Sequence, residues 1–292
     1  MNGYAVSTRD LKVRYGRTTA LTSVDLDLAP GRIHGLLGRN GTGKTTLMST
    51  IASLRRPHQG SVLVEGTDPF ENEALMEGVC LIRESGQAIN EAAPTVTLNL
   101  LQRARPTFDR EYADSLMTLF GVDASKKPGR MSRGQQSAFG AVIGLSSRAP
   151  LTMFDEVHLG MDAPTRQLFY DALIADFAEH PRTVLISSHL ISEIETFLDT
   201  VTILSGGTVL LSEGADDVRS KGVTLTGPAA VVDAATAGHH PVGLRDLGPT
   251  RAVTLFEDLD PAVLHDAERA GVQVGPVPLQ DLFIHLTKEP TS

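Results

Sequence analysis

Residues 38–45 constrain this chain more than any other stretch, because they match every fixed position of the phosphate-binding loop pattern. Residues 33–37 before them form an apolar run typical of a strand, and residues 45–54 after them are typical of a helix. A strand, a glycine loop and a helix in this order are the context that the pattern requires. The glycines let backbone N–H groups converge on phosphate oxygens at a helix N-terminus. The stretch therefore predicts a nucleoside triphosphate as ligand.

The side chains that end this phosphate loop, residues 38–45, have separate expected roles. Lys44 is expected to reach the β- and γ-phosphates, and the hydroxyl of Thr45 to ligate Mg²⁺. The other residues here that we expect to contact the nucleotide are Gly38, Asn40, Gly41, Gly43 and Thr46. A chance glycine-rich turn followed by a lysine is the alternative interpretation, and the flanking strand and helix make it the weaker one.

Size, charge and cysteine content limit the classes of function. With 292 residues the chain exceeds the usual size of one domain, so one large domain with a small appendage is expected. Acidic residues outnumber basic ones by 35 to 26, and the net charge of −9 disfavours nucleic acid or anionic lipid as the main partner. No apolar run approaches the roughly 20 residues of a spanning helix, so we expect a cytoplasmic chain that forms no pore. The single cysteine, Cys80, excludes internal disulfides and a multi-cysteine metal site.

Strand-like and helix-like runs alternate through residues 1–213, which is typical of an α/β domain. The expected strands are residues 24–28, 33–37, 61–64, 78–82, 151–154, 183–187 and 201–204. Between about residues 85 and 147 helical patterns replace strands, which indicates a helical subdomain inserted into the core. Its expected helices are residues 97–105, 110–120 and 134–147. Residues 214–292 predict a small accessory α+β domain, with an exposed loop at residues 238–243.

A second acidic motif accompanies the phosphate loop. Residues 151–154 form an apolar strand that leads directly into Asp155 and Glu156. Ligands of open α/β sheets bind at the carboxyl ends of the strands, so both carboxylates are expected beside the nucleotide. Asp155 would hold Mg²⁺ through its water shell, and Glu156 would orient or deprotonate the attacking water. An exposed turn explains Asp-Glu equally well when the motif stands alone, and the pairing with Lys44 and Thr45 favours the functional interpretation.

Further motifs follow the phosphate loop in a fixed order. They are Ser-Arg-Gly-Gln at 132–135, Asp-Glu at 155–156, Gly-Met-Asp at 160–162 and Ser-Ser-His at 187–189. In this order the chain resembles the ATP-binding subunit of ABC transporters, over roughly residues 5–215. The resemblance implies a P-loop NTPase core and a head-to-tail dimer. In that dimer each ATP lies between the phosphate loop of one subunit and the signature motif, residues 132–135, of the other.

Several residue roles come from this resemblance. Ser132 and Gly134 of the signature motif would present a hydroxyl and a backbone N–H to the γ-phosphate at a helix N-terminus, with Gln135 beside them. Tyr15 matches the aromatic residue that stacks on adenine, although a core or surface tyrosine is the plain alternative. His189 matches the switch histidine that would hydrogen-bond the γ-phosphate and the attacking water.

One further role and two departures complete this comparison. Asp162 matches the aspartate that links the two active sites across the dimer. The family usually carries glycine directly after the signature serine, whereas Arg133 stands here, and we expect it to face solvent. The family also ends the strand at residues 78–82 with a glutamine that ligates Mg²⁺ and senses the membrane partner. Glu84 occupies that position and Gln87 lies three residues further on, so either can fill the role, and Glu84 could still bind Mg²⁺.

The resemblance implies a motor subunit that binds ATP, dimerises, hydrolyses ATP and drives a separate membrane-spanning permease. Such a subunit would lie at the inner face of the cell membrane, where the permease contacts the helical subdomain. The chain's ending resembles bacterial exporter ATPases, which favours export. One alternative is a soluble ABC-type ATPase acting on ribosomes or DNA. Ribosome-acting members carry two ATPase cassettes in one chain and DNA-acting members carry long coiled coils, whereas this sequence has one phosphate loop and no heptad run. Another is a non-hydrolysing module that uses ATP as a dimerisation switch.

Overall fold

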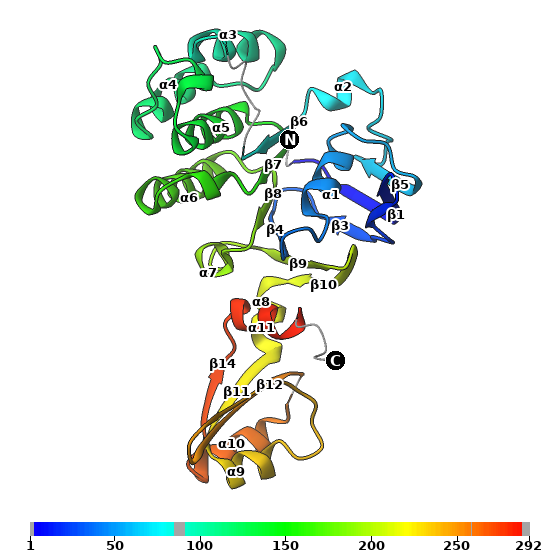
Figure 1. Ribbon diagram of the computed structural model, residues 1–292, viewed down its shortest axis with the longest axis vertical. Coiled ribbons are helices and arrows are strands. Elements are labelled where there is room, and N and C mark those ends of the chain that lie inside the picture. Colours follow the sequence, from blue (N-terminus) through cyan, green and yellow to red (C-terminus); the bar gives the residue numbers. More distant parts are fainter. Residues whose placement is uncertain (1–2, 85–90, 258, 288–292) are drawn as a thin grey trace. The chain divides into compact units, whose positions relative to one another are not determined.

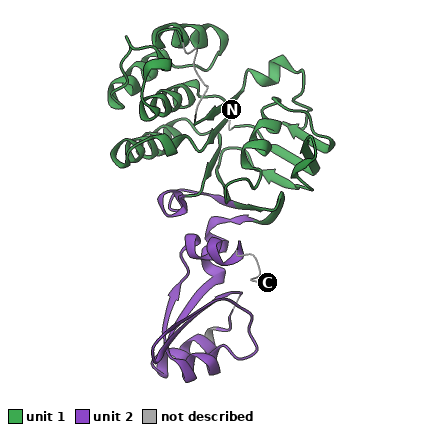
Figure 2. Cartoon of the chain, viewed as in Figure 1, with its two compact units in different colours: residues 1–189, 202–211 green, residues 190–201, 212–292 purple. Residues whose placement is uncertain are grey.

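A computed structural model describes residues 3–84, 91–257 and 259–287 of the chain (Figure 1). Internal packing divides the chain into two compact units (Figure 2). The N-terminal unit comprises Met1–His189 and Thr202–Leu211, and the C-terminal unit comprises Leu190–Val201 and Ser212–Ser292. Within the described ranges, no helix combines the length and the apolar character that crossing a bilayer requires.

The first strands of the N-terminal unit form an antiparallel sheet. Its strands are β1 (Val6–Tyr15), β2 (Thr18–Leu21), β3 (Leu26–Leu28) and β5 (Gln59–Val64), with β2, β3 and β5 all paired to β1. The sequence analysis named no strand for β1, because its period-two alternation is interrupted. Asp10 adopts a left-handed φ of 47° and the pairing with β5 slips between Arg9 and Lys12, so two neighbouring residues are exposed.

The second sheet of this unit positions the phosphate loop. Its order is β10-β9-β4-β8-β7-β6, with parallel pairing of β4 with β8, β8 with β7 and β7 with β6. The strands are β4 (Ile33–Gly38), β6 (Val79–Arg83), β7 (Leu151–Asp155), β8 (Thr183–Ser188), β9 (Thr200–Ser205) and β10 (Thr208–Gly214). Every strand expected from the sequence overlaps an observed one. Because the pairs are parallel, the carboxyl ends of β4, β6, β7 and β8 meet at one edge.

The core of the N-terminal unit lies around helix α1 (Lys44–Ile51), which packs against strands of both sheets. Leu47, Met48 and Ile51 of this helix are fully buried. They join a hydrophobic cluster with residues of β1, β4, β7 and β8. The helix that follows the phosphate loop is therefore held by a hydrophobic cluster drawn from several strands, and burial of this kind is the main favourable term in folding.

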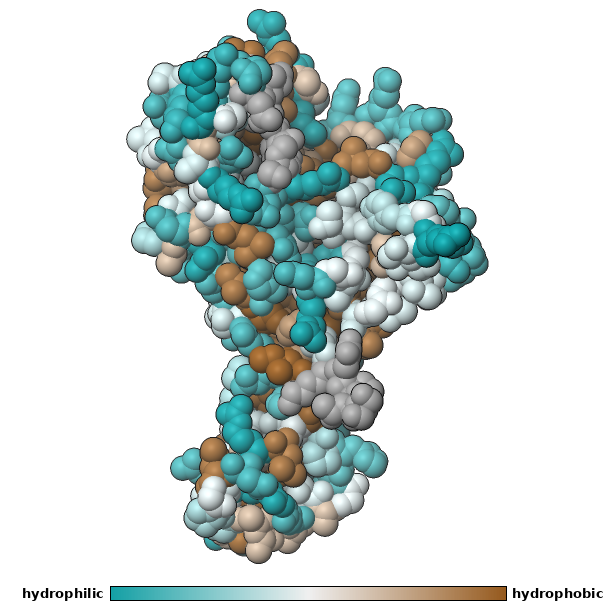
Figure 3. Space-filling model, viewed as in Figure 1, coloured by the Kyte–Doolittle hydropathy of each residue, from teal (hydrophilic) through white to brown (hydrophobic). Residues whose placement is uncertain are grey.

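In the described residues between β6 and β7, helices lie where the sequence patterns predicted them: α3 (Pro94–Ala104), α4 (Arg110–Leu119) and α5 (Arg133–Ser147). The short helix α2 (Glu73–Met76) precedes β6, the turn η1 (Pro128–Arg130) lies between α4 and α5, and α6 (Ala163–Glu179) follows β7. Helix α3 buries Leu98 but leaves Val96 and Leu100 exposed. Figure 3 shows hydrophobic residues among hydrophilic ones over the surface of this helical part.

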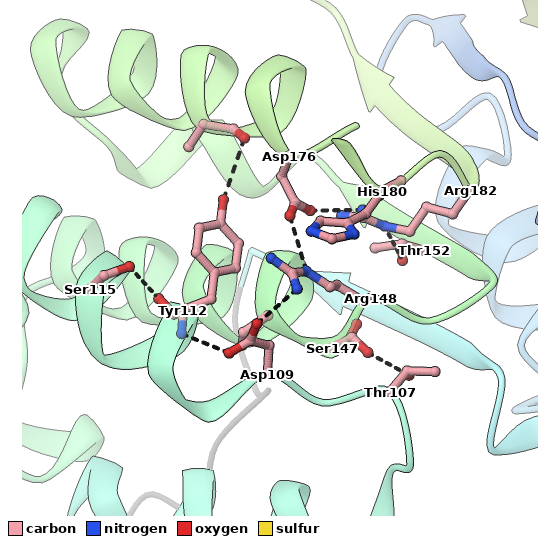
Figure 4. Close-up of polar contacts among 12 residues, drawn as sticks. Thr107, Asp109, Tyr112, Ser115, Ser147, Arg148, Thr152, Asp176, His180 and Arg182 are labelled. Carbon is pink, nitrogen blue, oxygen red and sulfur yellow. Dashed lines mark hydrogen bonds and ion pairs between the residues drawn. The ribbon is translucent and has the colours of Figure 1, made fainter. Parts of the chain in front are cut away.

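A buried ion cluster ties these helices together (Figure 4). Asp176 of α6 pairs with Arg182 at 2.7 Å and with Arg148 at 3.1 Å. Arg148, which ends α5 in a left-handed conformation, also pairs with Asp109 at 2.7 Å. Asp109 caps α4 by accepting a hydrogen bond from the backbone N–H of Tyr112. Helices α4, α5 and α6 and the start of β8 are therefore joined through charged side chains.

The C-terminal unit has an antiparallel sheet in the order β12-β13-β11-β14. Its elements are α7 (Ile191–Ile194), α8 (Ala215–Lys221), β11 (Gly222–Pro228), α9 (Ala229–Ala235), β12 (Pro241–Leu247), β13 (Thr250–Phe256), α10 (Pro261–Arg269), β14 (Gln273–Pro276) and α11 (Leu279–Leu286). The βαββαβ order from β11 to β14 is the ferredoxin-like arrangement. The loop expected at residues 238–243 is wrong from Pro241 onward, because β12 is an edge strand and an edge tolerates proline.

Candidate functional site

The phosphate loop turns from β4 into α1 through residues with left-handed backbone. Gly41 has a φ of 81°, and Gly43, which directly precedes α1, has a φ of 106°. A Cβ atom on Gly43 would also lie 2.8 Å from the carbonyl oxygen of Ala20 in β2. Only glycine meets both requirements without strain. The glycine spacing read from the sequence therefore corresponds to a real constraint on the loop.

Lys44 is folded into this loop and is almost fully buried. Its Nζ donates to the carbonyl oxygens of Gly38 at 2.7 Å and Arg39 at 3.2 Å. The same Nζ forms an ion pair with Oε1 of Glu156 at 3.0 Å. The positive charge is thus held over the phosphate loop and balanced by the carboxylate that follows β7.

The two acidic residues are arranged by Ser187. The register of β7 with β8 places Asp155 opposite Ser187, whose Oγ donates to Asp155 Oδ1 at 2.7 Å. The same Oγ accepts the backbone N–H of Glu156 at 3.0 Å. Glu156 has a left-handed φ of 51°, so the chain turns sharply after the strand. The sequence analysis quoted Ser187 only as part of a motif and missed this role.

His189 joins the site from the end of β8. Its Nδ1 lies 3.7 Å from the Glu156 Oε1 that also contacts Lys44, and the side chain is 35% exposed. Lys44, Glu156 and His189 are therefore brought together as the sequence analysis expected. A partly exposed imidazole beside a carboxylate can donate to or accept from a bound phosphate or water.

His158 is a further residue of this site that the sequence analysis missed. It lies in the turn η2 (Val157–Gly160) and is fully buried, with Nε2 3.1 Å from Ser188 Oγ. Burial lowers its pKa to about 4, with the Glu156 carboxylate opposing the shift and positive charges nearby adding to it. The groups that add to it are His189, Arg166 of α6 and Lys44. The only sequence signal was its position, two residues after Glu156.

The signature motif opens helix α5. Ser132 caps the helix by accepting the backbone N–H of Gln135 at 3.3 Å, and Arg133 is exposed as expected. A Cβ atom on Gly134 would lie 2.9 Å from the carbonyl oxygen of Gly160, so the helix start packs closely on η2. Among the residues that the structure describes, no hydrogen bond or ion pair joins the signature motif to the phosphate loop of the same chain.

Tyr15 and Asp162 each have a local structural explanation. Tyr15 is 46% exposed at the end of β1, with the guanidinium of Arg55 3.7 Å from the ring centroid. Asp162 caps α6 by accepting the backbone N–H of Thr165 at 3.0 Å, and its hydrogen bonds with Thr165 lower its pKa. Their roles with adenine and with a second subunit stay predictions.

The end of β6 carries a basic residue, Arg83, as well as the expected acidic residue, Glu84. Glu84 is exposed directly after the strand, and its carbonyl oxygen accepts from Ser137 Oγ at 3.5 Å. Arg83, opposite Asp155 in the register, donates to Ser49 Oγ of α1 at 2.9 Å. The sequence analysis did not single out Arg83. Gln87, the other candidate for the metal-coupling role, lies outside the described residues.

The oxygen donors at this edge fit a hard divalent cation. Thr45 is exposed at the start of α1, Asp155 is the last residue of β7, and Glu84 directly follows the neighbouring strand β6. Hydroxyl and carboxylate oxygens are the ligands that Mg²⁺ prefers, together with waters and substrate phosphates. In the described part of the chain no group of three or more histidine, cysteine or acidic residues gathers to hold a metal. One hydroxyl and two carboxylates suit an ion whose remaining ligands are waters and nucleotide phosphates.

Comparison with known proteins identifies the domain that contains this site. The ABC transporter family matches residues 21–158, which include the phosphate loop, the signature motif and the Asp-Glu motif. The chain therefore carries the ATPase domain of an ABC transporter. Within this ABC ATPase domain the phosphate loop follows β4 and Asp155 ends β7, so both stand at the same edge of the sheet with β8 between them.

Curated relatives extend the match of the ABC ATPase domain over most of the chain. The ABC transporter ATP-binding protein YtrB of Bacillus subtilis (strain 168) is 25% identical over 75% of this chain and 75% of its own length. The bacitracin transport ATP-binding protein BcrA of Enterococcus faecalis is 29% identical over 70% of this chain and 67% of its own length. Proteins named for ribose import and methionine import also match.

Solved structures show the same fold. An ATP-binding subunit of an ABC transporter superposes with a TM-score of 0.66 and 24% identity, covering 73% of this chain and 91% of that one. A dimeric ATP-binding cassette in a post-hydrolysis state with ADP and Pi superposes with a TM-score of 0.62 and 20% identity, covering 72% of this chain and 98% of that one. The α/β core of the ABC ATPase domain is thus the P-loop NTPase fold expected from the sequence.

Proposed function

We propose that this chain is the ATP-hydrolysing motor subunit of a membrane transporter, which dimerises on ATP and drives a separate permease. The observation that carries the proposal is the meeting of Lys44, Glu156 and His189 at one sheet edge, with Glu156 Oε1 3.0 Å from the lysine and 3.7 Å from the histidine. A phosphate-binding cation, a general base and a polarising imidazole are groups that promote phosphoryl transfer to water.

The proposed reaction assigns one task to each of these residues. Lys44 and the N–H groups of the phosphate loop bind the β- and γ-phosphates. Glu156 accepts the proton of the attacking water, and His189 holds the γ-phosphate. Thr45 and Asp155, with Glu84 beside them, would hold Mg²⁺, which neutralises charge on the phosphate oxygens. Tyr15 would stack on adenine with the ring face that Arg55 does not cover.

The proposed dimer completes each ATP site. Ser132, Gly134 and Gln135 open a helix whose N-terminal N–H groups suit an anion, and Ser132 and Arg133 are exposed. We propose that this helix start binds the γ-phosphate held by a second copy, with Asp162 between the two sites. A dimeric cassette among the proteins of the same fold supports this arrangement.

The proposed permease partner would contact the helical part of the ABC ATPase domain. Val96 and Leu100 lie one helical turn apart on α3 and are 45% and 49% exposed. Exposed apolar residues on one helix face are typical of protein-binding surfaces. The relatives include transport and import proteins, and we propose export on the exporter-like ending of the chain. Such a subunit would lie at the cytoplasmic face of the membrane through its permease.

The proposal is tested by replacing the expected base. We expect Glu156→Gln to bind ATP and to accumulate as a dimer, while hydrolysis falls at least about a hundredfold, the usual contribution of a general base. Purified full-length protein would be assayed for phosphate release and, by size-exclusion chromatography, for ATP-dependent dimers.

The matched control is Lys44→Ala, which should weaken ATP binding itself in a titration with labelled ATP. Undiminished hydrolysis by Glu156→Gln would refute the assignment of the base, and unchanged ATP affinity of Lys44→Ala would refute the phosphate site.

A further inference from the structure

His158 lies at the centre of the turn that follows the proposed base. It is fully buried, and it follows Glu156 by two residues and precedes Asp162 by four. Its ring lies 6.4 Å from the ring of His189 and 6.2 Å from that of Tyr170 on α6. A buried imidazole among aromatic and apolar side chains could simply contribute to core packing. The hydrogen bond that it makes argues for more.

The hydrogen bond of His158 defines its tautomer. Nε2 lies 3.1 Å from Ser188 Oγ, whereas Nδ1 is buried and has no hydrogen-bond partner among the described residues. A buried N–H without an acceptor is rare in proteins, because its desolvation is uncompensated. The ring of a neutral histidine therefore carries its proton on Nε2 and donates it to Ser188.

Ser188 connects this hydrogen bond to the reacting groups. It is the last residue of β8 and directly precedes His189. The neighbouring Ser187 contacts Asp155 and the backbone of Glu156, so both serines fasten the end of β8 to the turn after β7. Ser187 contacts the residues that carry the carboxylates, Asp155 and Glu156. Ser188 contacts His158 and is the residue directly before His189.

We propose that His158 is a positioning residue for ATP hydrolysis, because its Nε2–H holds Ser188 and thereby fixes His189 beside Glu156. His158 touches neither nucleotide nor water in this proposal and acts only through the end of β8. The inference deepens the proposed function and rests on it.

The test compares two substitutions of His158 in the full-length protein. Gln retains an N–H near the position of Nε2, whereas Leu has a similar volume and no donor. We expect His158→Leu to lower kcat about fivefold to tenfold, the scale of one lost hydrogen bond, with little change in KM for ATP. His158→Gln should stay within about twofold of the wild type. Thermal unfolding of both variants checks that they fold.

A second comparison tests whether the effect passes through His189. In a His189→Ala background, His158→Leu should lower kcat no further, because the residue that it positions is gone. Ser188→Ala should lower kcat as His158→Leu does, and the double variant should be no worse than either. Additive losses in these backgrounds would contradict the proposal.

Nitrogen NMR of the His158 ring gives a readout that does not depend on turnover or on the stability of the Leu variant. We expect a neutral ring with its proton on Nε2 at pH 7, and a ring protonated on Nδ1 would overturn the proposal. If Lys44→Ala and Glu156→Gln behave as described above and His158→Leu hydrolyses ATP like the wild type, the role of His158 is wrong and the proposed function stands. If Lys44→Ala still bound ATP normally and Glu156→Gln still hydrolysed it, the proposed function itself would be refuted.

Discussion

The ion pair between Lys44 and Glu156 links nucleotide binding to the chemistry of the site. Both partners are largely buried, and their contact is 3.0 Å long. A triphosphate carries several negative charges and competes for the same ammonium group. Its arrival would draw Lys44 away and leave the Glu156 carboxylate available to water. In this view the proposed base becomes available only after the substrate has been bound.

The lowered pKa of His158 predicts that the folded protein loses stability in mild acid. Its pKa of about 4 in the folded chain lies below the ordinary value of 6.5, so the unfolded chain takes up a proton first as the pH falls. The stabilisation is complete above pH 6.5 and is lost as the pH falls from 6.5 through 4, by up to about 3 kcal/mol. Thermal unfolding midpoints of the full-length protein, measured between pH 7 and pH 4.5, would show this loss.

The matched variant for this experiment is His158→Gln, which cannot titrate in that range. Its unfolding midpoint should fall less steeply with pH than that of the wild type. Parallel pH profiles of the two proteins would mean that His158 does not remain neutral in the folded chain.

Residues such as Ser187 and His158 mark the limit of prediction from sequence at this scale. Lys44, Asp155 and Glu156 were predictable because each lies in a motif next to a strand end. The contacts of Ser187 with Asp155 and of His158 with Ser188 depend on the register of β7 with β8 and on the left-handed turn at Glu156. No spacing in the chain encodes that register directly.

At the level of elements, the buried ion cluster of Asp176 holds α4, α5 and α6 together. Asp176→Ala would leave the guanidinium of the buried Arg182 without its carboxylate, and would take one partner from Arg148. We expect a loss of about 3–5 kcal/mol in the free energy of unfolding, the usual effect of breaking a buried pair. Urea denaturation followed by circular dichroism would measure it.

An exposed ion pair on the same helical part serves as the control. Asp114 pairs with Arg110 along α4 at 3.1 Å and is 57% exposed. Asp114→Ala should cost less than about 1 kcal/mol, because solvent screens such pairs. Equal losses for the two variants would show that the Asp176 cluster contributes no more than a surface pair.

Elements differed in how well their sequences revealed them. Fully buried strands such as β7 and β8 read as continuous apolar runs and were predicted. The edge strand β12 begins with Pro241 after a glycine and two histidines, a composition typical of loops, and the short helix α9 lacks a capping side chain. Such elements form through pairing and packing with distant residues, which local patterns do not encode.

At the scale of the whole molecule, the proposed contact of α3 with a permease predicts that membrane association depends on the exposed apolar residues of this helix. Leu100→Glu should reduce the fraction of full-length protein that sediments with cell membranes, because a charge would face the apolar surface of the proposed permease. ATP hydrolysis by the purified protein should change by less than about twofold, since the residue lies outside the site.

Leu54→Glu is the control for this prediction, because Leu54 is 65% exposed and follows α1 rather than lying on α3. It should leave sedimentation unchanged. If both variants or neither lost membrane association, α3 would not be the contact surface.

The close packing of Gly134 against Gly160 has a consequence for the behaviour of a dimer. The start of the signature helix and the turn that leads to Asp162 are in close contact within one chain, so a displacement of one would press on the other. In the proposed dimer, the signature helix start contacts the nucleotide held by the second copy. The turn packed against that helix start leads back along its own chain to Glu156. Binding of ATP at one site of the proposed dimer would therefore alter the other site. The two sites would bind and release nucleotide cooperatively rather than independently.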